Sequence, residues 1–315
     1  MAFEVPKIKY TGKIKEVIIG SGSQAVKIGG ESCYPFYIFE GEMPNIPKVA
    51  FDVWDYPPDD WQEWAIEPYR DVIQDPLAWA KKCVEVYGAE AIVLQLKSAD
   101  PNGMNRDVES VIAVVKKVAY GINVPLIIWG TANDEKDTEL LKRVAEVCEG
   151  KNVAIGPVSD KNYKQIGAAS IGYGQVVMAS SPIDVNLGKQ LNILLGNLGV
   201  TDEKIAMDPT TGGLGYGLEY TYSVMERDRM AALTQEDGKL QYPIFCNVAP
   251  EVWKTRETRL TQDDDPKLGD EKKRSILMES VTAISMLLAG ADIVVMRHPE
   301  SIKLVKDMIR ELTEP

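Results

Sequence analysis

The most unusual stretch of the sequence is a loop rich in glycine and hydroxyl groups, Asp208-Pro209-Thr210-Thr211-Gly212-Gly213-Leu214-Gly215-Tyr216-Gly217. Its glycines let backbone approach a ligand closely, and its hydroxyls and amides precede a helix and can bind carboxamide, phosphate or carboxylate groups. The alternative is a flexible loop that only leads into the helix. The GxGxxG spacing of a dinucleotide site is absent. The candidate cofactor-binding residues here are Asp208, Thr210, Thr211, Gly212, Gly213 and Tyr216.

Further polar or aromatic candidates follow other strand-like runs. His298 is the only histidine, so it is a candidate proton donor, cofactor neighbour or metal ligand, or else a helix cap before Pro299. With no second histidine, and with Asp52, Asp55 and Asp208 not spaced as a ligand set, we expect no bound metal and assign no catalytic residue. The remaining candidates for cofactor binding are Gln95, Ser98, Trp129, Thr131 and Asn247.

The four cysteines are far apart in the sequence, with no CxxC spacing that could hold an iron-sulfur cluster or zinc. Cys83 and Cys148 lie in helical patterns and Cys246 in an apolar strand pattern. We therefore expect three buried thiols and no cluster on this chain.

From residue 48 onward, short β-branched runs alternate with amphipathic helical stretches, which is typical of repeated βαβ units and a parallel sheet. Eight such units with no spare edge strand favour a closed (β/α)8 TIM barrel over an open doubly wound sheet. The stretch 162–169 is the least regular of the helices. The expected strands are 48–54, 91–96, 125–130, 153–158, 176–180, 205–210, 243–248 and 293–297.

Residues 1–47 precede the barrel of residues 48–315 and contain two strand-like runs around Ser21-Gly22-Ser23-Gln24. They predict an N-terminal β-hairpin that is a plug or an oligomer contact, within one structural domain overall. In a TIM barrel, active sites lie at the carboxyl ends of the strands. Two long loops should lie there, 55–74 and 251–273, and their aromatic residues suggest a partner surface.

The composition restricts the class of function. Apolar residues make up 45% and charged residues 26% of the 315 residues, enough for a sizeable core. A net charge of −12 argues against nucleic-acid binding, which depends on clustered Lys and Arg. No apolar run approaches the roughly 18 residues of a membrane span, and the first residues lack a signal-peptide core, so we expect a cytoplasmic protein without membrane contact.

Three stretches closely resemble the small subunit of the corrinoid iron-sulfur protein of the carbon monoxide dehydrogenase/acetyl-CoA synthase (Wood-Ljungdahl) pathway: AFDVWDYPPDDW (50–61), MDPTTGGLGYGLEYTYSVMERDR (207–229) and GADIVVMRHPES (290–301). The resemblance extends along essentially the whole chain. It implies a TIM barrel paired with a large subunit that carries the 4Fe-4S cluster, with cobalamin shared between the two. It also implies methyl transfer from methyltetrahydrofolate, through its methyltransferase, to acetyl-CoA synthase, and a carrier role without catalysis.

Two alternatives stay open at this stage. A pterin-binding methyltransferase shares the barrel and the pathway, and Asp208, Asn247 and Arg297-His298 could surround a pterin ring, although the strand-end Asp and Asn motifs of that family are not found in the expected order. A purely structural barrel with no ligand at its mouth is the other.

Overall fold

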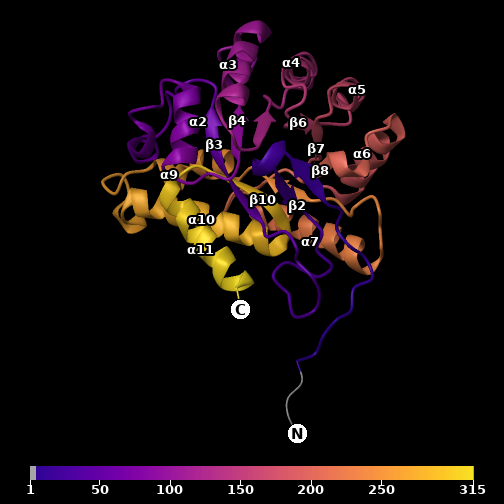
Figure 1. Cartoon of the computed structure of the whole chain (residues 1–315). Helices are drawn as coiled ribbons and strands as arrows, with labels where there is room; N and C mark the ends of the chain where they lie inside the picture. Colours follow the sequence, from indigo (N-terminus) through magenta and orange to yellow (C-terminus); the bar gives the residue numbers. More distant parts are fainter. Residues whose placement is uncertain (1–4, 315) are drawn as a thin grey trace.

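Eight parallel strands form a closed barrel in the computed structural model, which describes residues 5–314 (Figure 1). Each strand pairs with the next along the chain, and the last, β10, pairs with the first barrel strand, β3, from Ile293 with Lys48 to Met296 with Phe51. The predicted closure is confirmed. The strands are β3 (Lys48–Trp54), β4 (Ile92–Gln95), β5 (Leu126–Trp129), β6 (Ala154–Val158), β7 (Val176–Ser180), β8 (Ile205–Asp208), β9 (Ile244–Cys246) and β10 (Ala291–Met296).

Helices surround the barrel, and several begin at an acidic or amide side chain that accepts from backbone N–H groups. Asp75, Asp107, Asn133 and Asp184 cap α2, α3, α4 and α6 in this way. The stretch expected to be the least regular is a continuous helix, α5. It ends where Gly174 adopts the left-handed conformation. The main helices are α2 (Pro76–Glu85), α3 (Val108–Gly121), α4 (Asp134–Val147), α5 (Tyr163–Tyr173), α6 (Val185–Leu198), α7 (Leu218–Thr234), α10 (Glu271–Ala289) and α11 (Pro299–Thr313).

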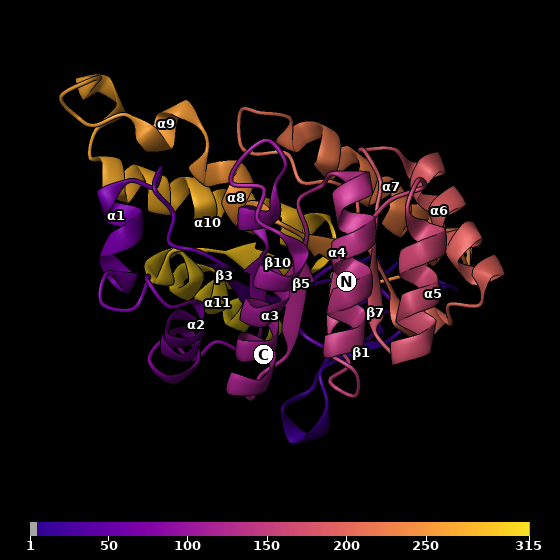
Figure 2. The same cartoon turned by 90° about the horizontal axis from the view of Figure 1, so that it is seen from above.

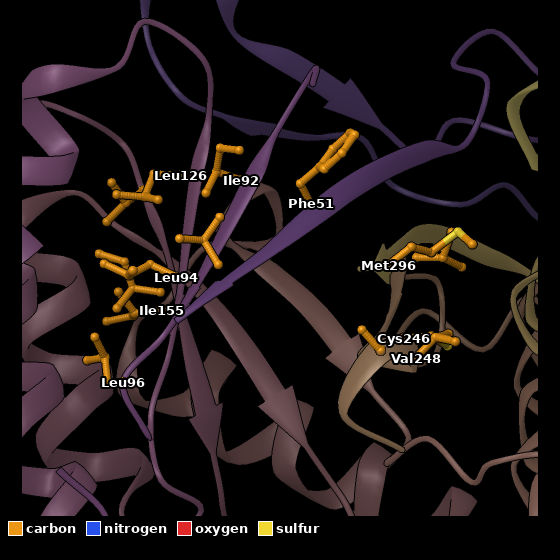
Figure 3. Close-up of a cluster of buried hydrophobic side chains, with 14 of the residues drawn as sticks. Phe51, Ile92, Leu94, Leu96, Leu126, Ile155, Cys246, Val248 and Met296 are labelled. Atoms are coloured by element: carbon orange, nitrogen blue, oxygen red, sulfur yellow. The ribbon is translucent and has the colours of Figure 1, made fainter. Parts of the chain in front are cut away.

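Alternation along each strand divides the side chains into two layers. One set, including Phe51, Leu94 and Ile155, packs outward against the helices, and Figure 3 shows part of this layer. The other set, including Ala50 and Ile127, fills the bore of the barrel. The predicted burial of Cys83, Cys148 and Cys246 is confirmed, and Cys33 is buried as well.

The N-terminal hairpin, β1 (Val17–Ile19) and β2 (Val26–Ile28) joined through η1 (Gly22–Gln24), closes the amino end of the barrel. Val17, Ile19 and Ile28 pack against side chains of the bore. The side-chain amide of Asn152, just before β6, donates to the carbonyls of Ile18 (2.8 Å) and Gly20 (3.0 Å). Of the two roles predicted for the hairpin, the structure shows the plug.

The opposite end of the barrel carries the long loops, as Figure 2 shows for α1 and α9 on the side away from β1. Of the aromatic residues that suggested a partner surface, Trp61, Tyr69 and Trp253 are buried within this protein and cannot form such a surface. No helix within residues 5–314 combines the length and the apolar character that a membrane crossing requires. The short elements are α1 (Glu63–Ile66), η2 (Glu67–Tyr69), η3 (Lys97–Ala99), η4 (Asp202–Lys204), α8 (Val248–Trp253), α9 (Arg256–Arg259) and η5 (Pro266–Leu268).

Candidate functional site

The inward-facing polar side chains at the carboxyl end of the barrel are paired with one another. Gln95, the last residue of β4, donates from its amide to Asn247 Oδ1 (2.9 Å), across the mouth of the barrel. The Ser180 hydroxyl at the end of β7 donates to Asp208 Oδ2 (2.6 Å) at the end of β8. These side chains use their hydrogen-bonding groups on each other, so few donors or acceptors remain to bind a ligand inside the bore.

An aromatic pair closes the bore beside these polar groups, since Trp129 is the register partner of Gln95. The rings of Trp129 (β5) and Phe245 (β9) are stacked, with centroids 4.9 Å apart. Trp129 is 7% exposed and belongs to the same cluster as Met178 and Ala206. At this level the bore is therefore filled by packed side chains.

The loop after β8 has a fixed base. Asp208 accepts the backbone N–H of Thr210 (3.0 Å), and the Thr210 hydroxyl donates to the carbonyl of Ser181 (2.8 Å). Thr221 of α7 donates to the Thr210 carbonyl and accepts the N–H of Gly212, both at 2.9 Å. Burial raises the pKa of Asp208 to about 6, opposed by the Ser180 hydroxyl and the Thr210 N–H. The flexible-loop alternative does not describe this base.

The tip of the same loop points outward. Leu214 is 37% exposed and Tyr216 is 52% exposed, and the Tyr216 hydroxyl donates to Glu257 Oε2 (3.0 Å) on α9. Among the described residues, nothing accepts from the backbone N–H of Leu214 or Gly215. Gly212 and Gly213 are buried against neighbouring backbone, and the hydroxyl oxygen of buried Thr211 has no hydrogen-bond partner within residues 5–314. An apolar and aromatic tip with free amides is suited to a broad ligand that carries both apolar surface and carboxamides.

Two of the candidate hydroxyls hold loops in place. Ser98 is buried, and both its N–H and its hydroxyl donate to Asp55. Thr131 donates from its N–H (2.8 Å) and its hydroxyl (2.9 Å) to Asp137 Oδ1. Burial raises the pKa of Asp137 to about 6 despite these hydrogen bonds. Both hydroxyls are committed to buried carboxylates.

His298 is the cap of α11. Its Nδ1 accepts the backbone N–H of Glu300 (3.2 Å), and its ring stacks on Trp253. The backbone N–H of His298 donates to the carboxylate of Glu279. The side chain is 1% exposed, and burial lowers its pKa to about 4, so the imidazole is neutral at pH 7. The capping alternative describes its position.

A cleft of about 590 Å³ opens at the rim between the loops after β3, β4, β9 and β10. Trp54, Lys97, Trp253 and Arg297 are among its lining, which includes none of the twelve candidate residues. The strand-end rule could have found it, because Trp54 ends β3, Lys97 comes two residues after Gln95, and Arg297 directly follows β10. Charged and bulky side chains at the strand ends were the sequence feature that could have indicated this cleft.

Arg297 is the centre of this region. Its guanidinium pairs with Asp52 Oδ2 (2.9 Å), both side chains being almost completely buried, and it lies 3.5 Å from the ring centroid of Trp61. Trp54 and Trp253 are also within cation–π distance. The Tyr69 hydroxyl donates to the Arg297 carbonyl (2.5 Å), and Glu279 accepts the Arg297 N–H (2.6 Å). An ion pair, aromatic contacts and two backbone hydrogen bonds thus anchor the chain at the end of β10.

Metal-ligating side chains do not gather at the rim: within residues 5–314, no group of three or more His, Cys, Asp or Glu residues could hold a metal ion.

The barrel fold is that of the dihydropteroate synthases. The enzyme from Xanthomonas albilineans superposes with a TM-score of 0.62 at 11% identity, covering 96% of this chain and 100% of that one. The enzyme from Stenotrophomonas maltophilia gives 0.58 at 15% identity, covering 87% and 96%. At these identities the likeness concerns the fold alone.

Sequence similarity assigns the chain to a more specific group than the fold does. Residues 16–311 match the family model described as CO dehydrogenase/acetyl-CoA synthase delta subunit. The delta subunit of the acetyl-CoA decarbonylase/synthase complex of Methanopyrus kandleri is 36% identical over 94% of this chain and 72% of the relative. Its counterpart from Archaeoglobus fulgidus is 34% identical over 98% and 71%. The chain belongs to the CO dehydrogenase/acetyl-CoA synthase delta subunit family.

Proposed function

We propose that this chain is the small subunit of a heterodimeric corrinoid iron-sulfur methyl carrier and that its barrel mouth covers the cobalamin. The observation that carries the proposal is the closed mouth, with Trp129 stacked on Phe245 and Gln95 paired with Asn247. A bore whose inward polar groups pair with one another, as Gln95 with Asn247 and Ser180 with Asp208, supports a cover rather than a chamber. The family supports it, since the relatives are named as subunits of an acetyl-CoA decarbonylase/synthase complex.

The loop after β8 fits a corrinoid. A corrin ring is broad, apolar on its faces and decorated with amides, and the loop offers exposed Leu214 and Tyr216 with free N–H groups between them. In the proposal these residues make the contact, while Asp208, Thr210 and Gly212 hold the shape of the loop. Thr211 and Gly213 are buried within the loop, Gln95, Trp129 and Asn247 close the mouth of the barrel, and Ser98, Thr131 and His298 hold neighbouring loops. When bound, the corrinoid supplies the cobalt that accepts and releases the methyl group.

The proposed partners follow from the same role. A large subunit with the 4Fe-4S cluster would share the cobalamin, a methyltransferase would deliver the methyl group of methyltetrahydrofolate, and acetyl-CoA synthase would receive it. This chain would contribute control of access and no catalytic residue.

Co-expression with the large subunit tests the proposal. We expect a coloured heterodimer with a corrinoid absorption spectrum, and the Leu214→Ser/Tyr216→Ala variant should lower corrinoid per heterodimer several-fold. Tyr120→Ala is the matched control, because Tyr120 is equally exposed (55%) but lies near the end of α3. A colourless chain that forms no heterodimer would refute the proposal. Methyltetrahydrofolate binding by the chain alone in calorimetry would instead favour the pterin methyltransferase.

A further inference from the structure

Two cations at the rim cleft have unused hydrogen-bond donors. Among the described residues, no acceptor contacts Lys97 Nζ, and no carboxylate lies within 4.0 Å of it. Arg297 Nε donates to Asp52 Oδ2 (3.0 Å) and Nη2 lies 2.9 Å from the same oxygen in the ion pair, whereas Nη1 has no hydrogen-bond acceptor within residues 5–314. Both side chains line the same cleft. A cation shielded from bulk water gains substantially from a charge-assisted hydrogen bond, so these donors favour an anion.

Most of the nearby carboxylates are already occupied. Asp60 pairs with Arg259 (3.1 Å) and Glu251 with Lys254 (2.6 Å). Asp100 Oδ1 accepts the N–H of Asn102 (2.8 Å). Asp59, the remaining acidic residue of the lining, is exposed to solvent. Among the described residues, Lys97 is therefore the cation of the lining that forms no ion pair within 4.0 Å, although the charges of Asp52, Asp100 and Glu251 act on it from farther away.

The aromatic residues define the rest of the cleft. Trp54 and Trp61 pack edge to face, with centroids 5.1 Å apart, and the Trp253 ring centroid lies 5.7 Å from the Arg297 guanidinium carbon. Trp54 is partly exposed to the cleft. Indole rings favour flat ligands, and about 590 Å³ is within the usual size range of small-molecule sites.

We propose that this cleft is a second ligand site, which binds a small molecule carrying an oxyanion, carboxylate or phosphate, on a planar ring. The oxyanion accepts from Lys97 Nζ and Arg297 Nη1, and the ring lies against Trp54. The cleft borders the loop after β8, because the backbone of Glu251, which lines the cleft, packs against Gly213. No residue of that loop lines the cleft, so the proposal goes beyond the corrinoid role and does not require it.

Titration of the full chain without corrinoid tests this site. The probes are benzoate and phenyl phosphate, with benzamide as the neutral isostere of benzoate and inorganic phosphate as the anion without a ring. Calorimetry gives the affinity, and quenching of indole fluorescence reports the tryptophans. We expect saturable binding of benzoate or phenyl phosphate at least tenfold tighter than benzamide and inorganic phosphate. The stronger of the two identifies the oxyanion.

Lys97→Gln should weaken that binding about tenfold or more, the loss expected when a hydrogen bond to a charged group is removed. Lys254→Gln, in the same cleft but 58% exposed and paired with Glu251, should change it less than threefold. Because Lys97 contacts no acceptor, its substitution should leave the melting temperature unchanged, which separates lost binding from misfolding. Equal affinity for benzamide and benzoate, an unaffected Lys97→Gln variant, or no saturable binding of any probe would overturn the proposal. The corrinoid proposal would be untouched by any of these results.

Discussion

Substitution of Asp52 by Asn tests whether the buried ion pair with Arg297 supports the rim. Asn keeps the shape of the side chain but removes the charge opposite a guanidinium that is 3% exposed. Removing one partner of a buried pair costs roughly 3–5 kcal/mol, because the other charge stays buried without compensation. Here Arg297 keeps its stacking on Trp61 at 3.5 Å and its access to the cleft through Nη1. We therefore expect the lower end, about 3 kcal/mol.

Urea unfolding followed by circular dichroism measures this loss as a lower midpoint at unchanged slope. At roughly 2 °C per kcal/mol for a chain of this size, the melting temperature should fall by about 6 °C. The double variant Asp52→Asn/Arg297→Met should recover part of the loss, because it leaves no unpaired charge. A loss below about 1 kcal/mol for Asp52→Asn, or a double variant as unstable as the sum of the single variants, would show that the pair does not support the rim.

Three further predictions concern single positions. His298→Ala should cost about 1 kcal/mol of unfolding free energy by removing the cap of α11, whereas His298→Asn should retain the cap. His298→Asn should also reduce the loss of stability as pH falls from 6.5 towards 4, because the wild-type chain must protonate a buried imidazole in that range. Equal urea midpoints for the two variants at pH 7 would contradict the capping role. Burial, and then the Asp292 charge, raise the pKa of Glu31 to about 8, so its contribution to stability is present below pH 4.5 and is lost as pH rises towards 8, and Glu31→Gln should flatten that decline in unfolding experiments across the range. Gly212→Ala should lower the melting temperature, because a Cβ there would collide with the backbone of Gly217. Gly172→Ala, in open space on α5, should raise the melting temperature slightly. A higher melting temperature for Gly212→Ala than for Gly172→Ala would refute the packing of the loop.

The repeated pattern predicts the barrel well because each strand and helix is specified locally. The bounds of β3 and β7 agree with the sequence prediction, and their β-branched runs end at polar or aromatic residues that mark the rim. The strand-end rule also selected Gln95 and Asn247 correctly as rim residues. Their mutual hydrogen bond joins positions 152 apart in the sequence, and no local pattern contains that information.

The loops were harder to predict for a physical reason. A loop has no periodicity, so the sequence does not show which of its aromatic residues face solvent. Trp61 and Trp253 were interpreted as partner-binding groups, yet both are buried around Arg297. Arg297 was considered only beside His298 in the pterin alternative, because its burial depends on an ion pair with Asp52, 245 positions away, which no local pattern reveals.

The two ends of the barrel restrict where function can lie. The hairpin and the buried Arg229, paired with Asp292 (2.5 Å) and Glu31 (3.3 Å), seal the amino end. The Trp129 and Phe245 stack seals the bore from the other side. Ligand chemistry is thereby confined to a thin layer of rim loops, where the loop after β8 and the cleft beside Arg297 offer different surfaces. A barrel closed in this way can serve a cofactor held mainly by another chain, because it needs to present only a shaped and rigid face.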